Sequence, residues 1–195
     1  MTSSVNDVSV SSELNARLKA IKLVVFDVDG VLTDGRLYYS PTGEALKVFN
    51  VKDGVGIKLL RDCQVQVAIM TAKDSSMVAK RIADLGIEHY FPGVKDKGLQ
   101  LDALATRQGL DSAQLCFVGD DMVDLPAMAI AGVGICPQDA YSLVRQAADL
   151  ITPMGGGQGV ARYVCDVILQ AKGQYESAYQ MAMAPQFEKD RTRTT

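Results

Sequence analysis

Short apolar runs and longer amphipathic segments alternate along most of the chain. Runs rich in Val, Ile, Leu and Phe have the composition of buried strands, and they occur at residues 23–27, 65–70, 87–91, 115–118, 134–136 and 150–151. Apolar residues at helical spacing predict helices between these runs, after Ser11 or Ser12 and at residues 54–61, 75–85, 97–108, 126–131, 141–147 and 160–171. Asp53 and Asp74 are expected to cap the second and third of these helices. Strands that alternate with helices indicate an α/β fold with a doubly wound parallel sheet.

One segment, residues 34–49, departs from this alternation and predicts a β-hairpin. Residues 37–39 suit a strand, Ser-Pro-Thr-Gly at 40–43 suits a turn, and residues 46–49 suit a returning strand. Because the hairpin follows the first strand closely, we expect it to fold over the end of that strand as a small flap. The chain has no longer insertion that would form a large cap domain.

The length of 195 residues fits one domain that is long enough to bury a core. Neither an internal repeat nor a linker divides the sequence. We therefore expect a single domain with an N-terminal extension at 1–20, a core at 21–172 and a C-terminal tail at 173–195. The first ten residues are polar and lack periodicity, which is typical of a loose terminus, and the tail follows no pattern that assigns it an element.

The charge balance and the apolar runs argue against several classes of partner. A net charge of −3 gives no basic footprint for nucleic acid or for an anionic membrane. No apolar run approaches the roughly 18 residues of a membrane-spanning helix. The Ser-rich start lacks the apolar core of a signal peptide, so we expect a cytoplasmic protein.

The cysteines and the histidine also limit the chemistry. Four scattered cysteines with no Cys-x-x-Cys pair predict buried, reduced thiols rather than a metal site. The single histidine, His89, excludes a multi-histidine zinc site and argues against a serine–histidine–aspartate triad. We interpret His89 as structural.

Two carboxylates follow the first predicted strand. Asp27 and Asp29 are two positions apart, so continued strand geometry would project them to the same side, and Gly30 then lets the chain turn away. Carboxylates at a buried strand end need partners or a cation, and ligands bind at the carboxyl ends of strands in open α/β sheets. The alternative is a strand that ends in a solvated acidic turn. The longer string Asp-Val-Asp-Gly-Val-Leu-Thr favours a cation site that contains a nucleophile.

That string, at residues 27–33, resembles the first motif of the haloacid dehalogenase superfamily of phosphohydrolases. Its continuation, Thr-Asp-Gly at 33–35 and Phe-Asn-Val-Lys-Asp-Gly at 49–54, resembles one branch of that superfamily. The branch contains the 3-deoxy-D-manno-octulosonate 8-phosphate phosphatases and relatives that act on similar sugar-acid phosphates. The resemblance covers about residues 21–172 and implies the haloacid dehalogenase type of Rossmann-like fold.

Later segments match the remaining motifs of the superfamily in order. Thr71 follows a buried strand, Lys97 comes at a later loop, and Gly-Asp-Asp at 119–121 follows another buried strand, with Asp124 beyond it. Alone, Thr71 would be interpreted as a turn residue and Lys97 as a solvated lysine. Carboxylates this close together repel one another unless a cation lies near, so the ordered set of motifs favours a functional site.

The resemblance implies a phosphatase in which Asp27 is the nucleophile and becomes an aspartyl phosphate. Asp29 would protonate the leaving alkoxide and then activate the water that hydrolyses the intermediate. Thr71 would donate a hydroxyl hydrogen bond to the phosphate, and Lys97 would supply a positive charge to it.

The same resemblance implies a magnesium ion as the cofactor. Its ligands would be the carboxylates of Asp27 and Asp120 and the backbone carbonyl of Asp29, because Mg²⁺ prefers hard oxygen donors. Asp121 and Asp124 are expected as outer ligands or orienting residues.

The resemblance also implies a set of substrate-side residues, which are Thr33, Asn50, Asp53, Lys73, Arg81 and Arg162. After Thr71 the family pattern is Gly-Arg, whereas this chain has Ala72-Lys73. Lysine keeps the charge but loses the planar fork that suits a carboxylate. The leading hypothesis is a 3-deoxy-D-manno-octulosonate 8-phosphate phosphatase of lipopolysaccharide biosynthesis, and the nearest alternative is a phosphatase of a nine-carbon sugar acid 9-phosphate.

Related small phosphatases cover their sites by forming tetramers, in which a neighbour's hairpin and tail complete each pocket. The segment Gly-Gly-Gln-Gly-Val-Ala-Arg at 156–162 resembles their glycine-rich tail motif, although a flexible turn before a helix is the competing interpretation. We therefore expect a homotetramer. A different class of function, a non-catalytic oligomerisation module of the same fold, is disfavoured by the intact Asp27, Asp29, Lys97 and Asp120.

Overall fold

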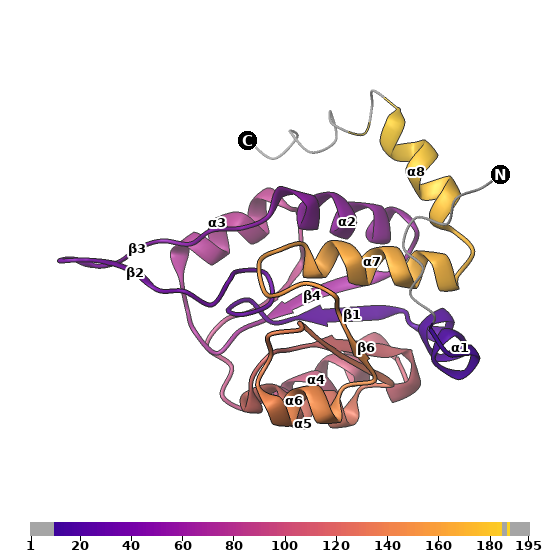
Figure 1. The fold of residues 1–195 in the computed structure, drawn as a ribbon, viewed down its shortest axis with the longest axis horizontal. Coiled ribbons are helices and arrows are strands. Elements are labelled where there is room, and N and C mark those ends of the chain that lie inside the picture. The colour runs from indigo at the N-terminus through magenta and orange to yellow at the C-terminus, as the bar shows by residue number, and fades with distance from the viewer. Residues whose placement is uncertain (1–9, 185–186, 188–195) are drawn as a thin grey trace.

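A six-stranded parallel sheet forms the centre of the protein, in the order β5-β4-β1-β6-β7-β8. The computed structural model describes residues 10–184 and 187, and Figure 1 shows the sheet with its flanking helices. The strands of this sheet are β1 (Leu23–Phe26), β4 (Gln66–Met70), β5 (His89–Phe91), β6 (Leu115–Val118), β7 (Val133–Cys136) and β8 (Leu150–Ile151). The predicted doubly wound α/β fold is confirmed.

Helices cover both faces of the sheet (Figure 1). They are α1 (Ser12–Ala20), α2 (Val51–Asp62), α3 (Ser76–Asp84), α4 (Lys97–Gln108), α5 (Leu125–Ile130), α6 (Ser142–Ala147), α7 (Val160–Ala171) and α8 (Tyr175–Met183), with short 3₁₀ helices η1 (Ser112–Gln114) and η2 (Met122–Asp124). Within the described part of the chain, no helix combines the length and the apolar character that crossing a membrane requires.

The central strand β1 is buried on both faces, as its unbroken apolar run predicts. Val24 and Phe26 pack into the core that contains buried side chains of α2, α3 and α7. Leu23 and Val25 point to the opposite face, into the core that contains buried side chains of α4, α5 and α6. The carboxyl end of β1 is therefore held from both sides, between β4 and β6.

The predicted hairpin is present, with a shifted register. It consists of β2 (Tyr38–Ser40) and β3 (Gly43–Leu46), so the returning strand begins inside the expected turn at 40–43 and ends where the expected strand 46–49 begins. The serine at position 40 still belongs to β2, and only Pro41 and Thr42 connect the two strands.

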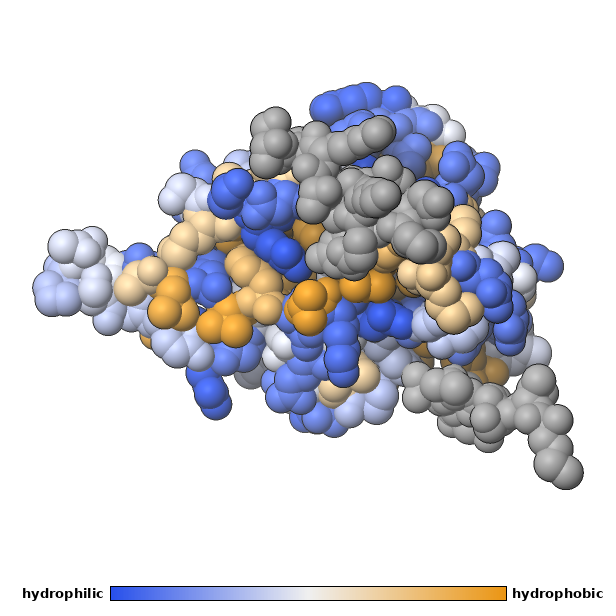
Figure 2. Space-filling model, turned by 90° about the horizontal axis from the view of Figure 1, so that it is seen from above, coloured by the Kyte–Doolittle hydropathy of each residue, from blue (hydrophilic) through white to orange (hydrophobic). Residues whose placement is uncertain are grey.

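The hairpin extends beyond the carboxyl end of β1 (Figure 1). Large apolar side chains of the hairpin and of the adjacent chain are between 46% and 67% exposed, and they are Leu37, Tyr39, Leu46, Val48 and Val51. Figure 2 shows hydrophobic surface next to the projecting tip. Part of this face thus lacks an apolar partner within the described chain.

Two predicted caps are wrong. The second helix begins at Val51 rather than residue 54, because Asn50 caps it by accepting from the Lys52 N–H at 3.0 Å. Asp53 consequently lies in the first turn. The third helix has Ser75 at its cap position with no side-chain cap, so Asp74 does not cap it.

The first helix agrees with the prediction, whereas the tail contains a helix that the sequence did not predict. The prediction of a first helix capped by Ser11 is confirmed, with the Leu14 N–H donating to Ser11 Oγ at 3.2 Å. The tail, to which no element was assigned, contains α8. The expectation of loose chain at residues 1–9 and most of the tail beyond 184 lie outside the described residues.

Candidate active site

Asp27 and Asp29 lie just beyond the carboxyl end of β1, in the middle of the sheet. The Asp27 N–H continues the pairing with β6 by donating to the Val118 carbonyl at 2.9 Å. Gly30 then turns the chain with a φ of +82°, and a Cβ there would lie 2.0 Å from Asp120 Oδ2. Glycine is required at this turn, because any side chain would collide with a carboxylate of a later motif.

Three carboxylates meet at this strand end. Oxygen atoms of Asp27, Asp120 and Asp124 lie within 4.8 Å of one another. Burial first, and then the charges of neighbouring carboxylates, raise the pKa of Asp27 to about 7 and that of Asp120 to about 8. A bound cation would offset this repulsion, and Mg²⁺ prefers hard oxygen donors. The donor set therefore fits a magnesium ion, which Asp27 and Asp120 would hold.

Lys97 lies between two of these carboxylates. It is the first residue of α4 and is 2% exposed. Its Nζ is 2.9 Å from Asp27 Oδ2 and 2.5 Å from Asp124 Oδ1. Burial opposes the lysine charge, but the two carboxylates outweigh this effect and raise the pKa of Lys97. The site thus holds a buried, charged ammonium group beside the proposed nucleophile.

Asp124 and Asp121 differ sharply in their surroundings. Asp124 has no exposed surface. Its Oδ2 accepts from the N–H groups of Asp120 at 2.9 Å and Asp121 at 3.2 Å, while its Oδ1 accepts from Lys97. Asp121 is exposed, and its Oδ1 accepts from the Met122 N–H at 2.7 Å. These contacts favour Asp124 as the orienting residue, and a metal-related role for Asp121 stays a prediction.

A cavity of about 280 Å³ opens over the carboxylates. It brings together the predicted nucleophile, the predicted acid, a metal ligand and two predicted phosphate contacts, from three strand ends and from the start of α4. Thr71, directly after β4, is 2% exposed, and its Oγ1 accepts from the Lys73 N–H at 3.4 Å. The cavity is lined by Asp27, Asp29, Gly30, Gly35, Thr71, Ala72, Lys73, Lys97, Asp120, Asp121 and Val123.

Two hairpin side chains that the sequence did not assign also reach this site. The Lys47 side chain is only 1% exposed, and its Nζ contacts Asp29 and lies 3.1 Å from Glu44 Oε1. Glu44 Oε2 in turn accepts from Lys73 Nζ at 2.6 Å. The hairpin therefore lies over one side of the cavity. The available signal was two charged residues, Glu44 in β3 and Lys47 directly after it. Their partners, Lys73 and Asp29, are 29 and 18 residues away.

Thr33 and Asp53 are buried, and both side chains form hydrogen bonds with other residues of the chain. Thr33 Oγ1 is 3.4 Å from both Asp29 Oδ1 and the Val28 carbonyl, which fixes the loop after β1. Asp53 Oδ1 accepts from the Arg162 N–H at 2.8 Å and so caps α7 from α2. Burial raises the pKa of Asp53 to about 6, although this backbone hydrogen bond favours the charged form.

The other predicted substrate-side residues lie on the side of α2, α3 and α7. Asn50 donates to the Gly157 carbonyl at 3.3 Å, and Arg81 lies 5.9 Å from the Phe49 ring centre. Arg162 Nε contacts both carboxylate oxygens of Asp166 at 3.0 Å. Within the described chain, none of these three residues lines the cavity over the carboxylates, nor does Asp53. Their contacts with substrate stay predictions.

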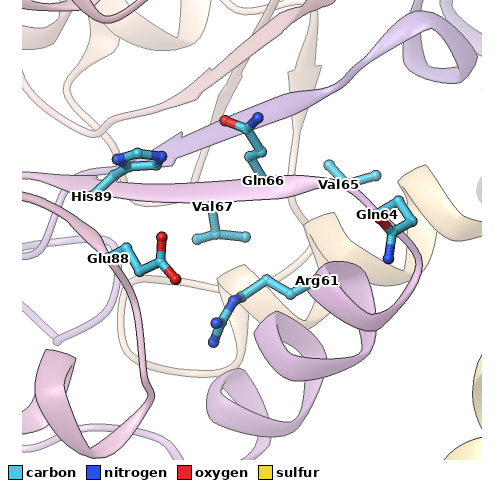
Figure 3. A pocket seen from close by; sticks show the side chains of 7 residues that line it. All are labelled: Arg61, Gln64, Val65, Gln66, Val67, Glu88 and His89. Atoms are coloured by element: carbon cyan, nitrogen blue, oxygen red, sulfur yellow. The ribbon is translucent and has the colours of Figure 1, made fainter. Parts of the chain in front are cut away.

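A separate cavity of about 250 Å³ lies at the amino ends of β4 and β5 (Figure 3). It is lined by Arg61, Gln64, Val65, Gln66, Val67, Glu88 and His89. The carboxylates lie beyond the other ends of the strands, so the two cavities share no described residue. His89 is therefore remote from the candidate active site.

Known proteins are similar to this chain in sequence and in fold. Residues 91–164 match the family model of the haloacid dehalogenase-like hydrolases. The 3-deoxy-D-manno-octulosonate 8-phosphate phosphatase of Haemophilus influenzae is 44% identical over 160 residues, which are 82% of this chain and 89% of that protein. The enzyme of the same name from Escherichia coli strain K12 is 38% identical over 169 residues, 87% of this chain and 90% of that protein.

A solved structure with bound ligands is also similar. The 3-deoxy-D-manno-octulosonate 8-phosphate phosphatase of Moraxella catarrhalis, in complex with a magnesium ion, a phosphate ion and the sugar acid, superposes with a TM-score of 0.85. It is 36% identical, and the match covers 88% of this chain and 98% of that one.

Proposed function

Because the chain belongs to the haloacid dehalogenase-like hydrolases, within the group of 3-deoxy-D-manno-octulosonate 8-phosphate phosphatases, we propose that it releases phosphate from that sugar-acid phosphate. The observation that carries the proposal is the contact of Lys97 Nζ with Asp27 Oδ2 at 2.9 Å, inside a cluster of three carboxylates. A nucleophile, a cation site and a fixed positive charge are the parts that phosphate monoester hydrolysis needs.

Asp27 attacks phosphorus, and the bond between phosphorus and the sugar oxygen breaks. Asp29 gives its proton to the departing alkoxide. It then takes a proton from a water molecule, which attacks phosphorus and returns Asp27 to its free form. Thr33 Oγ1, 3.4 Å from Asp29 Oδ1, helps to orient this acid.

Charge neutralisation makes the first step feasible, since a phosphate dianion repels a carboxylate. Magnesium, when bound by the carboxylates of Asp27 and Asp120 and the backbone carbonyl of Asp29, supplies positive charge to the phosphate. Lys97, whose Nζ is 2.9 Å from Asp27 Oδ2, adds a second positive charge. Thr71 lines the cavity and offers a hydroxyl donor to a phosphate oxygen.

The substrate is tested by phosphate release across a panel of esters under equal magnesium. The panel contains 3-deoxy-D-manno-octulosonate 8-phosphate, a nine-carbon sugar acid 9-phosphate, and D-mannose 6-phosphate as an ester without a carboxylate. We expect the highest kcat/KM on the eight-carbon acid. Preference for the nine-carbon acid would establish the alternative substrate, and absence of turnover on every ester would leave only a non-catalytic role.

We also propose that the active enzyme is a homotetramer with shared sites. Support comes from the exposed apolar side chains of the hairpin. Between β1 and α2, the described chain also places only the β2–β3 hairpin and no large cap. Light scattering at the assay concentration tests this directly, and a fully active monomer would refute it. Arg162 contacts Asp166 of its own chain. Mixed tetramers of Asp27→Asn and Arg162→Ala subunits would therefore recover activity only if Arg162 also serves a neighbour.

Cytoplasmic location and a step in lipopolysaccharide biosynthesis complete the proposal. Cys63, Cys116, Cys136 and Cys165 are free thiols, which agrees with a reducing compartment. Cell fractionation followed by immunodetection tests the location, and detection outside the cytoplasmic fraction would refute it.

A further inference from the structure

The glycine-rich segment at residues 155–159 packs against the loop that follows β1 in its own chain, residues 29–34. A Cβ at Gly156 would lie 2.1 Å from the carbonyl oxygen of Gly30 and 2.8 Å from that of Thr33. Gly156 is not among the glycines with positive φ, so its backbone would accept a side chain. Glycine is required there because the two backbones approach each other too closely for any Cβ.

Asp139 fixes the glycine-rich segment from another direction. It belongs to the β7–α6 loop, residues 137–141, between Cys136 and Ser142. Its Oδ1 accepts from the Gly156 N–H at 3.0 Å. A Cβ at Gly155 would lie 2.6 Å from its Oδ2, so the carboxylate lies directly against the segment. Gly156 is therefore in contact with Asp139 through its N–H group and with the loop after β1 through its Cα.

The same β7–α6 loop holds the acidic motif that follows β6. The Tyr141 N–H donates to the backbone carbonyl of Asp120 at 2.8 Å. The Asp120 carboxylate in turn lies against Gly30, where a Cβ would be 2.0 Å from Asp120 Oδ2. A closed circuit of contacts thus joins the β7–α6 loop, Asp120, Gly30 and Gly156. Gly30, at the turn of the loop after β1, has Asp120 and Gly156 as its neighbours in this circuit.

We propose that Asp139 is a positioning residue for the metal site. The carbonyl of Asp29, an expected metal ligand, belongs to the peptide group that joins it to Gly30, so a shift of Gly30 also moves that carbonyl. Asp139 holds Gly156 against Gly30 and so fixes the Asp29 carbonyl relative to the Asp120 carboxylate. The inference rests on the proposed function for the reaction that this site serves, but metal binding can be measured without substrate.

Two substitutions at one position separate the hydrogen bond from the charge. Asp139→Ala removes the acceptor for the Gly156 N–H. The Kd for magnesium should then rise roughly tenfold, as is typical when a group that orients a metal ligand is lost. Asp139→Asn keeps an oxygen acceptor and should bind magnesium almost as tightly as the wild type. Asp139 lies outside the cavity over the carboxylates, so both variants leave the lining of that cavity unchanged. Calorimetric titration of the substrate-free enzyme with magnesium chloride measures the Kd.

The matched structural control is Asp149→Ala. Asp149 also accepts from a glycine N–H, that of Gly134 at 2.8 Å, and it pairs with Arg17 at 2.7 Å. These contacts join α1 to the start of β7 and lie outside the cavity over the carboxylates. Their loss should lower Tm, measured by circular dichroism, and should leave the Kd for magnesium unchanged. If Asp139 contributed only to stability, Asp139→Ala would behave in the same way.

Hydrogen exchange and kinetics complete the test. In Asp139→Ala, the peptide that contains residues 29–34 should exchange faster than in the wild type. At saturating magnesium, kcat should fall roughly tenfold with KM for the ester nearly unchanged. Unchanged magnesium binding in Asp139→Ala, an equal loss in Asp149→Ala, or failure of Asp139→Asn to restore binding would each overturn the proposal. Absence of phosphate release by the wild type would instead refute the proposed function, and the magnesium titrations would still decide the role of Asp139.

Discussion

Asp124→Asn replaces one oxygen of a buried carboxylate that accepts hydrogen bonds from Lys97 and from the backbone N–H groups of Asp120 and Asp121. The remaining oxygen still accepts from the N–H groups of Asp120 and Asp121, but the new amide N–H₂ group faces Lys97 Nζ, where the carboxylate now accepts at 2.5 Å. Breaking a buried ion pair from one side costs about 3–5 kcal/mol. Lys97 keeps Asp27 as a partner at 2.9 Å. We therefore expect the free energy of unfolding to fall by about 3 kcal/mol, the lower end of this range.

The same change should slow the reaction. Lys97 would no longer be fixed from both sides, and a displacement of about 1 Å in a catalytic group reduces the rate about 10²-fold. The matched control is Asp62→Asn, which alters an exposed carboxylate on α2 that accepts from Lys58 Nζ at 2.8 Å and lies outside the cavity. The loss of that surface contact should cost about 1 kcal/mol or less and should leave kcat nearly unchanged.

Urea unfolding followed by circular dichroism, with chelator present, measures the stability of both variants. Phosphate release under saturating magnesium gives kcat. Equal effects of the two substitutions, or full activity of Asp124→Asn, would show that Asp124 does not orient Lys97 and that the reasoning from burial is wrong.

Three further outcomes are expected. Burial raises the pKa of Asp53 from 3.8 to about 6, so its contribution to stability is complete below about pH 4 and is lost as the pH rises through about 6. Relative to Asp53→Asn, the wild type should lose up to about 3 kcal/mol of unfolding free energy between about pH 4 and pH 7, and a pH-independent difference would contradict this. Gly30→Ala should impair activity far more than Gly43→Ala. Both glycines have positive φ, but a Cβ meets the Asp120 carboxylate only at Gly30, with nothing within 4 Å at Gly43; equal kcat values would exclude the clash. Exhaustive chelation should abolish phosphate release and added magnesium should restore it, while magnesium at about 100 times its Kd should stabilise the fold by about 2.7 kcal/mol; full activity of the chelated enzyme would refute the metal site.

The sheet and most of its helices could be predicted because their signals are local. The run at β1 is apolar at every position, which is what burial on both faces requires. The grouping of Thr71 and Asp120 around Asp27 followed from their positions at strand ends, because such ends meet at one edge of a parallel sheet. Lys97 joins them from the first position of α4, as the order of the motifs predicted. Periodicity and motif order were sufficient for these features.

Contacts between distant side chains could not be predicted in the same way. Asp53 has the composition of a local cap, yet it caps α7 across the fold while Asn50 caps its own helix. Lys47 and Glu44 have the composition of surface charges on a hairpin, and only the folded chain brings them to Asp29 and Lys73. Tertiary packing decides such cases, and no spacing in the sequence encodes it.

The most direct test of the account is to trap the phosphoryl group on Asp27. The magnesium-loaded enzyme, turning over substrate with a radiolabelled phosphate, is quenched in acid and digested, and the labelled peptide is identified by mass spectrometry. We predict an acid-stable, hydroxylamine-labile label on the peptide that contains Asp27, and neither label nor turnover in Asp27→Asn. Normal phosphate release by folded Asp27→Asn, with deamidation excluded by mass spectrometry, would contradict Asp27 as the nucleophile.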